Sequence, residues 1–120
     1  MQRDITIGNQ VIPMRATAGT AYRYRQVFGG DLLQLLIKSA EDAVSNAETI
    51  ETIQRLGYIM AASAEDKDMK SLNEDGYIDW LDQFDASDLI EALPSIMNTY
   101  IKNKETKTTP KRKGAEQSAK

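Results

Sequence analysis

The chain has 120 residues, which suggests one domain, and its composition excludes several kinds of site. It contains no cysteine, so neither a disulfide nor a thiolate metal ligand or nucleophile is possible. It contains no histidine either, which removes the usual general base and the commonest transition-metal ligand. We therefore expect a binding protein without catalytic residues or a cofactor, and not an enzyme.

The charge is divided unevenly along the chain. Residues 102–120 carry seven Lys and Arg against two Glu, a local charge of +5, so residues 1–101 carry −8 of the total of −3. The basic region holds no large apolar residue and cannot bury enough surface to offset its ordering entropy. We predict a folded domain over residues 1–103 and a disordered basic tail over residues 104–120. The cations expected to act in the tail are Lys107, Lys111, Arg112 and Lys113.

The sequence shows no apolar leader segment after Met1. No later stretch approaches the roughly 20 apolar residues that a membrane span needs. We therefore expect a soluble protein that is not exported and has no membrane partner.

The first predicted element is a β-hairpin. Residues 4–7 alternate polar and apolar side chains, Gly8 and Asn9 can supply the positive φ values of a tight turn, and residues 10–14 continue as an extended strand. Pro13 lacks an N–H group, so it belongs on an edge or at the end of the second strand.

Two helices are predicted next. Thr17 is the expected N-cap of the first, which runs to Phe28 and is ended by two glycines at residues 29–30. Asp31 can cap the second, which is apolar almost all round and is therefore the expected core helix. Its apolar residues are Leu32, Leu33, Leu35, Leu36 and Ile37.

A third helix is predicted from about Asn46 to Ala64, with one stripe of residues at helical spacing. Small residues in and beside this stripe would let a neighbouring element approach closely. The stripe consists of Ile50, Ile53, Gly57, Met60 and Ala61, and the small residues are Gly57, Ala61 and Ala64.

A polar acidic connection leads to a short helix carrying Tyr77, Trp80, Leu81 and Phe84. The final helix opens at Asp85, where carboxylates complement the helix dipole, and Pro94 should kink it. One face of this helix is apolar and comprises Leu89, Leu93, Ile96, Met97, Tyr100 and Ile101. The predicted fold is mainly α: a small helical domain with an N-terminal β-hairpin and a disordered basic C-terminal tail.

Residues 71–82 partly match a calcium-binding loop. The inner positions that match are Asn73, Asp75, Gly76, Ile78 and Asp79. The anchors do not match, because Ser71 stands where Asp is usual and Asp82 where the longer Glu is usual. An ordinary helix start at Ser71 is the favoured interpretation, and a calcium-responsive helical module stays open as an alternative.

A series of carboxylates continues through this region, comprising Asp75, Asp79, Asp82, Asp85 and Asp88. Without a histidine or a phosphate-cradling glycine-rich loop, nothing in the sequence selects a reaction for them. We interpret them as an acidic face that is solvated or that meets a basic partner, with no bound metal.

A group of Arg and Tyr residues in the first helical region could grip nucleic acid by charge and stacking. The group comprises Arg15, Arg23, Arg25, Tyr22 and Tyr24. Tyr22 and Tyr24 point in different directions on a helix, so the basic tail is the stronger nucleic-acid candidate. The acidic body argues against both, and nucleic acid is not the expected partner.

Two segments, read in chain order, resemble a known family. The first is Ile5 to Pro13 with the Arg/Tyr-rich helix after it, and the second is Tyr77 to Phe84 running on through Asp88 to Met97. In helix ends and aromatic positions, residues 4–103 resemble the tail assembly chaperones of siphophages and prophages of Gram-positive bacteria. The chain is more polar than this pattern at residues 65–76.

The resemblance implies a function in the host bacterial cytoplasm. Such chaperones bind the long, helical tape measure protein and keep it soluble until the tail tube polymerises around it, and they are absent from the mature virion. The tail tube protein is a further implied contact, and many members have a longer form made by a programmed ribosomal frameshift. Self-association is also expected, because small domains with spare helical faces tend to cover them.

Six side chains are predicted to form a client groove or the core beneath it: Trp80, Phe84, Leu89, Leu93, Met97 and Tyr100. The competing interpretation is that all six are plain core. The alternative function is a DNA-associated phage or prophage regulatory protein that uses the basic tail.

Overall fold

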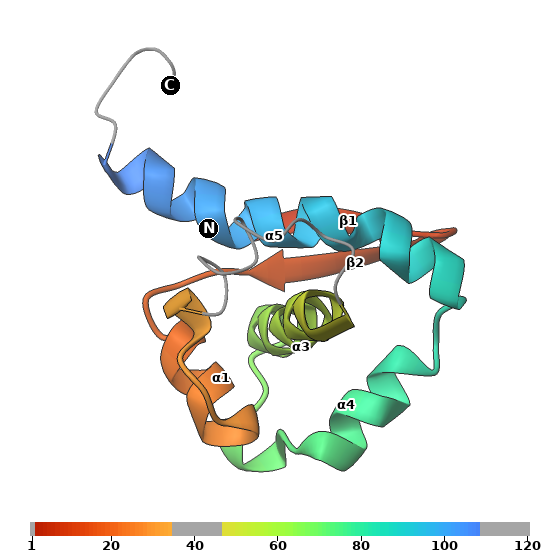
Figure 1. Cartoon of the computed structure of the whole chain (residues 1–120), viewed down its shortest axis with the longest axis horizontal. Helices are drawn as coiled ribbons and strands as arrows, with labels where there is room; N and C mark the ends of the chain where they lie inside the picture. The colour runs from red at the N-terminus through yellow and green to blue at the C-terminus, as the bar shows by residue number, and fades with distance from the viewer. Residues whose placement is uncertain (1, 35–46, 109–120) are drawn as a thin grey trace.

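A β-hairpin and several helices enclose one central helix, α3 (Ala47–Ala64), which is seen end-on in Figure 1. The computed structural model describes residues 2–34 and 47–108, with side chains through Ile101. The hairpin and α5 lie on one side of α3, α1 on a second and α4 on a third (Figure 1). The elements are β1 (Gln2–Ile7), β2 (Gln10–Arg15), α1 (Thr20–Phe28), α3, the 3-10 turn η1 (Met69–Ser71), α4 (Glu74–Leu81) and α5 (Ala86–Thr108).

The mainly α fold with an N-terminal hairpin is therefore confirmed. Within the two described stretches, no helix combines the length and the apolar character that crossing a membrane requires.

The hairpin turn lies where the sequence predicts it. β1 and β2 pair antiparallel with Ile7 opposite Gln10, which leaves Gly8 and Asn9 as the turn. Asn9 does not have the positive φ expected of it. Gly8 has a φ of +64°, a conformation that side chains disfavour. A Cβ atom at Gly8 would also come within 2.5 Å of a carboxylate oxygen of Asp88 on α5. The positive φ favours glycine here, and any other residue would also displace the Asp88 side chain.

One face of the hairpin belongs to the core. Ile5 and Ile7 of β1 and Met14 of β2 are buried there, while Val11 on the other face is 59% exposed. β2 packs beside α3 and β1 beside α5. Pro13 pairs opposite Asp4 in the two-stranded sheet, on an edge strand as predicted, where a missing donor is tolerated.

The predicted cap at Thr17 is wrong, because α1 begins later. The N-cap position is Gly19, with no side-chain hydrogen bond. The Thr17 hydroxyl instead accepts the N–H of Gly19 (3.1 Å), and the Thr20 hydroxyl accepts the N–H of Thr17 (2.9 Å). The two threonines close a turn ahead of the helix. This turn occupies the Thr17 hydroxyl oxygen, so Thr17 does not cap the helix.

The end of α1 agrees with the prediction. The Gly29 N–H donates to the Arg25 carbonyl at 2.9 Å, and φ is +79° at Gly29 and +88° at Gly30. Only glycine adopts such values without strain, so the chain turns away here.

Asp31 caps the next turn as predicted. Its carboxylate accepts the N–H groups of Leu33 (3.1 Å) and Gln34 (3.4 Å). Residues 32–34 are helical and Leu32 is buried, but Leu33 is 44% exposed, so the expected burial on more than one side is not found at these residues. The rest of the predicted core helix, with Leu35, Leu36 and Ile37, lies outside the described residues, so that part stays a prediction.

The third predicted helix is confirmed as α3, with nearly the predicted ends. Of its stripe, Ile53, Gly57, Met60 and Ala61 are buried and Ile50 is half-buried. A Cβ atom at Gly57 would lie 3.3 Å from Ile96 of α5 and 3.3 Å from the Trp80 ring of α4. The expected close approach at a small residue therefore occurs, and it involves two helices.

The start of α4 differs in detail from the prediction. Asn73 is the N-cap and accepts the N–H of Gly76 at 2.7 Å. Ser71 lies in η1, where its hydroxyl donates to the Asp68 carbonyl at 2.6 Å. α4 ends at Leu81, so Phe84 was wrongly placed within the short helix.

α5 follows directly after Asp85, whose carbonyl accepts the Leu89 N–H at 3.1 Å. Its predicted apolar face is confirmed, with Leu89, Leu93, Ile96 and Tyr100 buried and Met97 and Ile101 packed against the core. Pro94 lies inside the helix on the exposed side.

The predicted boundary of the basic tail is too early. Helix α5 continues to Thr108, so residues 104–108 are helical rather than disordered. A helix already anchored by packing can extend through good helix formers such as Lys and Glu at little cost. Residues 109–120 lie outside the described residues.

Substituting Gly57→Leu is expected to destabilise the domain by about 1–3 kcal/mol, because Ile96 and Trp80 leave no room for a side chain. Helix propensity alone would favour leucine over glycine by about 1 kcal/mol. A loss of stability in this variant would therefore come from packing. Urea denaturation measures it, with Ala47→Leu at the exposed start of α3 as the control. An unchanged or raised urea midpoint for Gly57→Leu would contradict the close approach.

Candidate functional site

The six side chains predicted to bind a partner divide between the core and its edge. Leu89, Leu93 and Tyr100 are buried, as the core interpretation requires. The other three pack against the core but keep some accessible surface: Trp80, Phe84 and Met97. A partner could reach only this second group.

The predicted basic residues cannot be placed in the same way. Lys107 lies in the last part of α5, where only the backbone is described. Lys111, Arg112 and Lys113 lie outside the described residues.

Most of the aromatic side chains form one connected group, the aromatic cluster, which joins α1, α3 and α4. Neighbouring ring centroids lie 5.1–6.2 Å apart in tilted or edge-on arrangements, which suit aromatic quadrupoles. Tyr58 of α3 is at its centre, in contact with rings from α1 and α4. The members are Tyr24, Phe28, Tyr58, Tyr77, Trp80 and Phe84.

A cation packs on the cluster from α3. The Arg55 guanidinium lies 5.0 Å from the centre of the Phe28 ring and 3.5 Å from the Glu51 carboxylate. Burial raises the pKa of Tyr77 to about 12, and the nearby Glu51 charge adds to the effect. Burial likewise raises the pKa of Tyr24. Both phenols are therefore neutral at neutral pH and pack as aromatic groups within the cluster.

Beside the cluster, α3, η1 and α4 enclose an open groove of about 600 Å³, which we call the α3–α4 groove. Its apolar walls are Trp80 and Tyr58, and its acidic walls are Asp68 and Asp79. Gly76 leaves the space in front of the Tyr58 hydroxyl, because a Cβ atom there would lie 2.6 Å from that oxygen. The volume is that of a small-ligand or side-chain binding site.

The groove borders an acidic stretch of the sequence. Residues 71–101 contain seven Asp and Glu and no Lys or Arg. Within the groove itself Lys67 is present at one end, where it pairs with Glu65 at 3.5 Å. Exposed Asp79 has no ion pair with any side chain that the structure describes. The Asp68 carboxylate accepts the Lys70 N–H at 3.2 Å with one oxygen and keeps the other. An apolar floor with carboxylates at its walls suits a cationic ligand.

The acidic stretch does not have the shape of a calcium loop. Residues 74–81 form helix α4, whereas a calcium loop curls around its ion without a continuous helix through the middle. The Asn73 side chain, which would be a ligand, caps the helix. In the parts of the chain with described side chains, no three acidic groups converge on one point.

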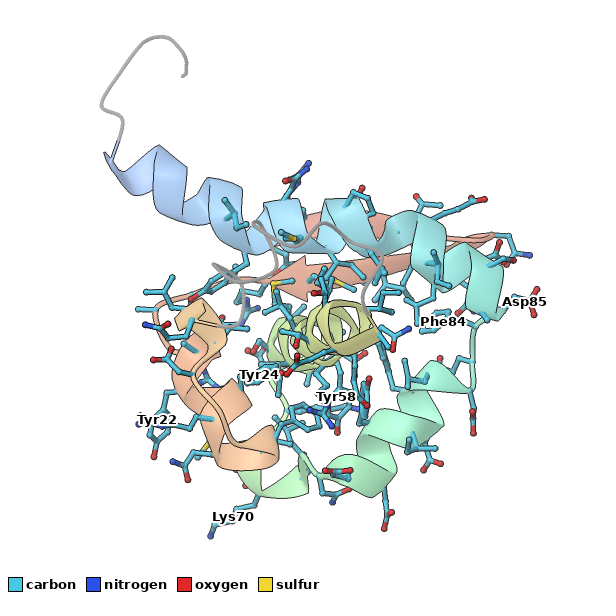
Figure 2. All side chains as sticks on the ribbon, viewed as in Figure 1. Tyr22, Tyr24, Tyr58, Lys70, Phe84 and Asp85 are labelled. Atoms are coloured by element: carbon cyan, nitrogen blue, oxygen red, sulfur yellow. The ribbon has the colours of Figure 1, made fainter. Side chains whose placement is uncertain are left out.

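The Arg/Tyr group is divided between separate surfaces. Tyr24 is buried, while Tyr22 is 51% exposed and points away from the body (Figure 2). Tyr22 and Arg25 line one pocket, of about 210 Å³. The group therefore does not form the single stacking surface that gripping nucleic acid requires.

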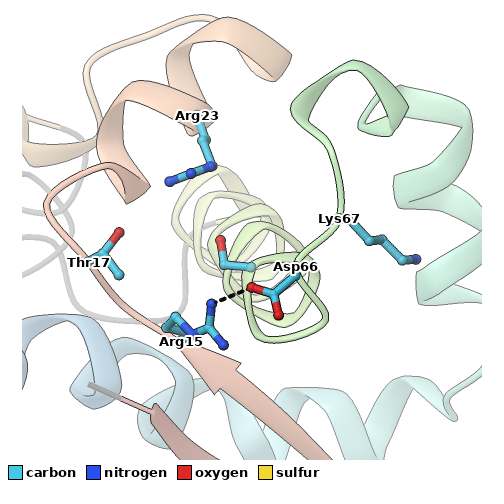
Figure 3. A pocket seen from close by; sticks show the side chains of 6 residues that line it. Arg15, Thr17, Arg23, Asp66 and Lys67 are labelled. Carbon is cyan, nitrogen blue, oxygen red and sulfur yellow. Dashed lines mark hydrogen bonds and ion pairs between the residues drawn. The ribbon is translucent and has the colours of Figure 1, made fainter.

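Arg15 and Arg23 line a different pocket, of about 190 Å³, at the end of α3 (Figure 3). There the Arg15 guanidinium meets the Asp66 carboxylate at 2.8 Å. Asp66 has a φ of +57°, and the next N–H, of Lys67, donates to the Ala62 carbonyl at 3.0 Å. The ion pair thus fastens β2 to the helix end and neutralises a cation that could have met a phosphate.

Some groove residues were not predicted from the sequence. Tyr58 was absent from the predicted stripe of its helix, and Asp68 from the acidic series. Gly76 was noted only as a calcium-loop position. The sequence did contain one sign of the groove. Gly76 lies inside a short helix, three residues after the Asn73 cap, where glycine lowers helix stability unless another group approaches it closely.

The pKa of Tyr77 predicts a loss of stability in alkali. Its folded-state value of about 12 lies above the ordinary 10.0, so its contribution is fully present below pH 10 and is lost between pH 10 and 12. At pH 11 the loss from this group is about 1 kcal/mol. The Tyr77→Phe variant keeps the aromatic ring but lacks the hydroxyl group that titrates.

Urea midpoints at pH 9 and pH 11 test this expectation, and the drop between them should be smaller for Tyr77→Phe than for the natural chain. Equal drops in the two proteins would show that Tyr77 is not held neutral by burial.

Comparison with known proteins supplies no further constraint on the site. No protein-family model, no curated protein and no solved structure matches this chain.

Proposed function

We propose that the chain is a tail assembly chaperone of a long-tailed phage or prophage, which holds the tape measure protein in the host cytoplasm until the tail tube polymerises. In this proposal it binds and releases its client without making or breaking bonds, and it leaves before the virion is complete. The resemblance of residues 4–103 to such chaperones motivates the proposal.

The observation that carries it is an exposed isoleucine on each of α4 and α5. Ile78 of α4 and Ile90 of α5 are each 49% exposed, although their neighbours Tyr77 and Leu89 are buried. Each helix therefore completes the core with one side and presents an isoleucine on another. Such side chains suit a client with long apolar helices, because they can bury its surface without a fixed register.

The accessible members of the predicted groove are further candidate contacts on α4, on α5 and between them. Trp80, Phe84 and Met97 lie at the edge of the core, so a client could contact them without unfolding the domain. Methionine and aromatic side chains adapt to differently shaped apolar partners. Leu89, Leu93 and Tyr100 have a supporting role beneath them.

Substituting Ile78→Ser and Ile90→Ser tests the proposal. Each change should weaken client binding by about tenfold, which corresponds to the loss of one well-buried aliphatic contact. Stability of the isolated chain should change by no more than about 0.5 kcal/mol, because both positions are on the surface. The measurement is the soluble fraction of the tape measure protein from the same genome after co-expression in bacteria.

Val11→Ser is the matched control, because Val11 is similarly exposed but lies on the outer face of the hairpin. It should keep the client soluble. A client that stays equally soluble with the Ile78→Ser, Ile90→Ser double variant, or that is insoluble even with the natural chain, would remove this function.

A further inference from the structure

The α3–α4 groove has the chemistry of a receptor for a short basic peptide. The Trp80 ring and the Tyr58 hydroxyl line it, and the carboxylates of Asp68 and Asp79 stand at its walls. Lys67 also lines the groove, and its charge is paired with Glu65 at 3.5 Å. Guanidinium and ammonium groups pack on aromatic faces and donate to carboxylates, so one cationic side chain can satisfy both kinds of wall. A volume of about 600 Å³ accommodates more than one such side chain.

The chain itself contains a segment of that chemistry. Lys111, Arg112 and Lys113 are consecutive cations in a region without large apolar residues. The seven carboxylates and the lack of any cation in residues 71–101 make the surroundings of the groove attractive to it. The complementarity therefore lies between two parts of one sequence.

The fold separates these two parts. α5 ends at Thr108 on the opposite side of the domain from α4 (Figure 1). The four residues from Thr108 to Arg112 span at most about 14 Å when fully extended. The domain measures 42 × 32 × 29 Å, so this reach is short compared with the size of the domain, and a groove on a second copy can be met without crossing it.

We propose that residues 111–113 of one copy dock in the α3–α4 groove of a second copy. The contact is heterologous, because donor segment and receptor groove are different surfaces, so each docked copy still offers a free groove or a free segment. The copies join head to tail, and the contact weakens as salt screens the charges. This interaction needs no client and does not depend on the function proposed above.

Two charge-reversed forms of the full-length chain test the proposal. The segment variant carries Lys111→Glu, Arg112→Glu and Lys113→Glu, and the groove variant carries Asp68→Lys and Asp79→Lys. The control carries Asp4→Lys and Glu91→Lys, which make the same charge change as the groove variant at exposed positions outside the groove. Sedimentation velocity at low salt over a range of concentrations measures association for each protein and for their mixtures.

The natural chain should associate as its concentration rises, and added salt should reverse this. Each reversed variant alone should associate at least about tenfold more weakly, while the control should behave like the natural chain. Mixed together, the two variants should form a one-to-one complex and nothing larger, because only one intact segment and one intact groove remain. Trp80 is the only tryptophan, so its emission should change when that complex forms.

Three results would overturn the proposal. The natural chain could stay monomeric at all concentrations in low salt, or both reversed variants could associate as strongly as the natural chain. A change in Trp80 emission that requires the natural segment but is independent of concentration would assign the groove to the segment of the same chain. None of these results bears on client solubility, so this inference and the proposed function fail separately.

Discussion

The packing of two helices against Gly57 is the constraint on which the rest of the structure depends. A glycine at the middle of α3 lets Ile96 of α5 and the Trp80 ring of α4 reach the same helix surface. The first contact closes the core beneath the hairpin, and the second brings α4 alongside α3. A Cβ atom alone would require small shifts of Ile96 and Trp80, and a larger side chain would push against both helices.

The α3–α4 groove is a direct result of this packing. α4 meets the domain mainly through rings, with Tyr77 and Trp80 against Tyr58, and flat rings in tilted contacts do not fill the space between helix backbones. The space that is left lies between the Trp80 ring and the carboxylates on η1 and α4. The same side chains therefore attach α4 and line the binding surface, and a substitution in the cluster changes both.

Local patterns in the sequence predicted the elements well, and contacts between distant residues explain what they missed. The turn at Gly8, the stop at Gly29 and the cap at Asp31 depend on neighbouring residues, and each is found where it was predicted. The start of α1 was misplaced because Thr17 and Thr20 bond to each other, a choice that a single-residue preference does not reveal.

The candidate site was less predictable for the same reason. The spacing of Leu89, Leu93 and Tyr100 placed them on one apolar face of the last helix, but it did not show whether that face is covered by the domain or open to a partner. Tyr58 and Trp80 are far apart in the chain, and only the fold brings their rings together. The acidic series was recognised in the sequence. The groove beside it could not be predicted, because it forms only where η1 packs next to α3 and α4.

The attachment of α4 by rings also determines how the domain opens. A helix of eight residues is too short to be stable alone in water, so α4 keeps its backbone hydrogen bonds only while Tyr77 and Trp80 are docked. Detachment and unwinding are thus one cooperative event, in which the amide protons of α4 become exchangeable together. The domain then has a less stable edge around a more stable centre, and that edge lies where the proposed ligand would bind.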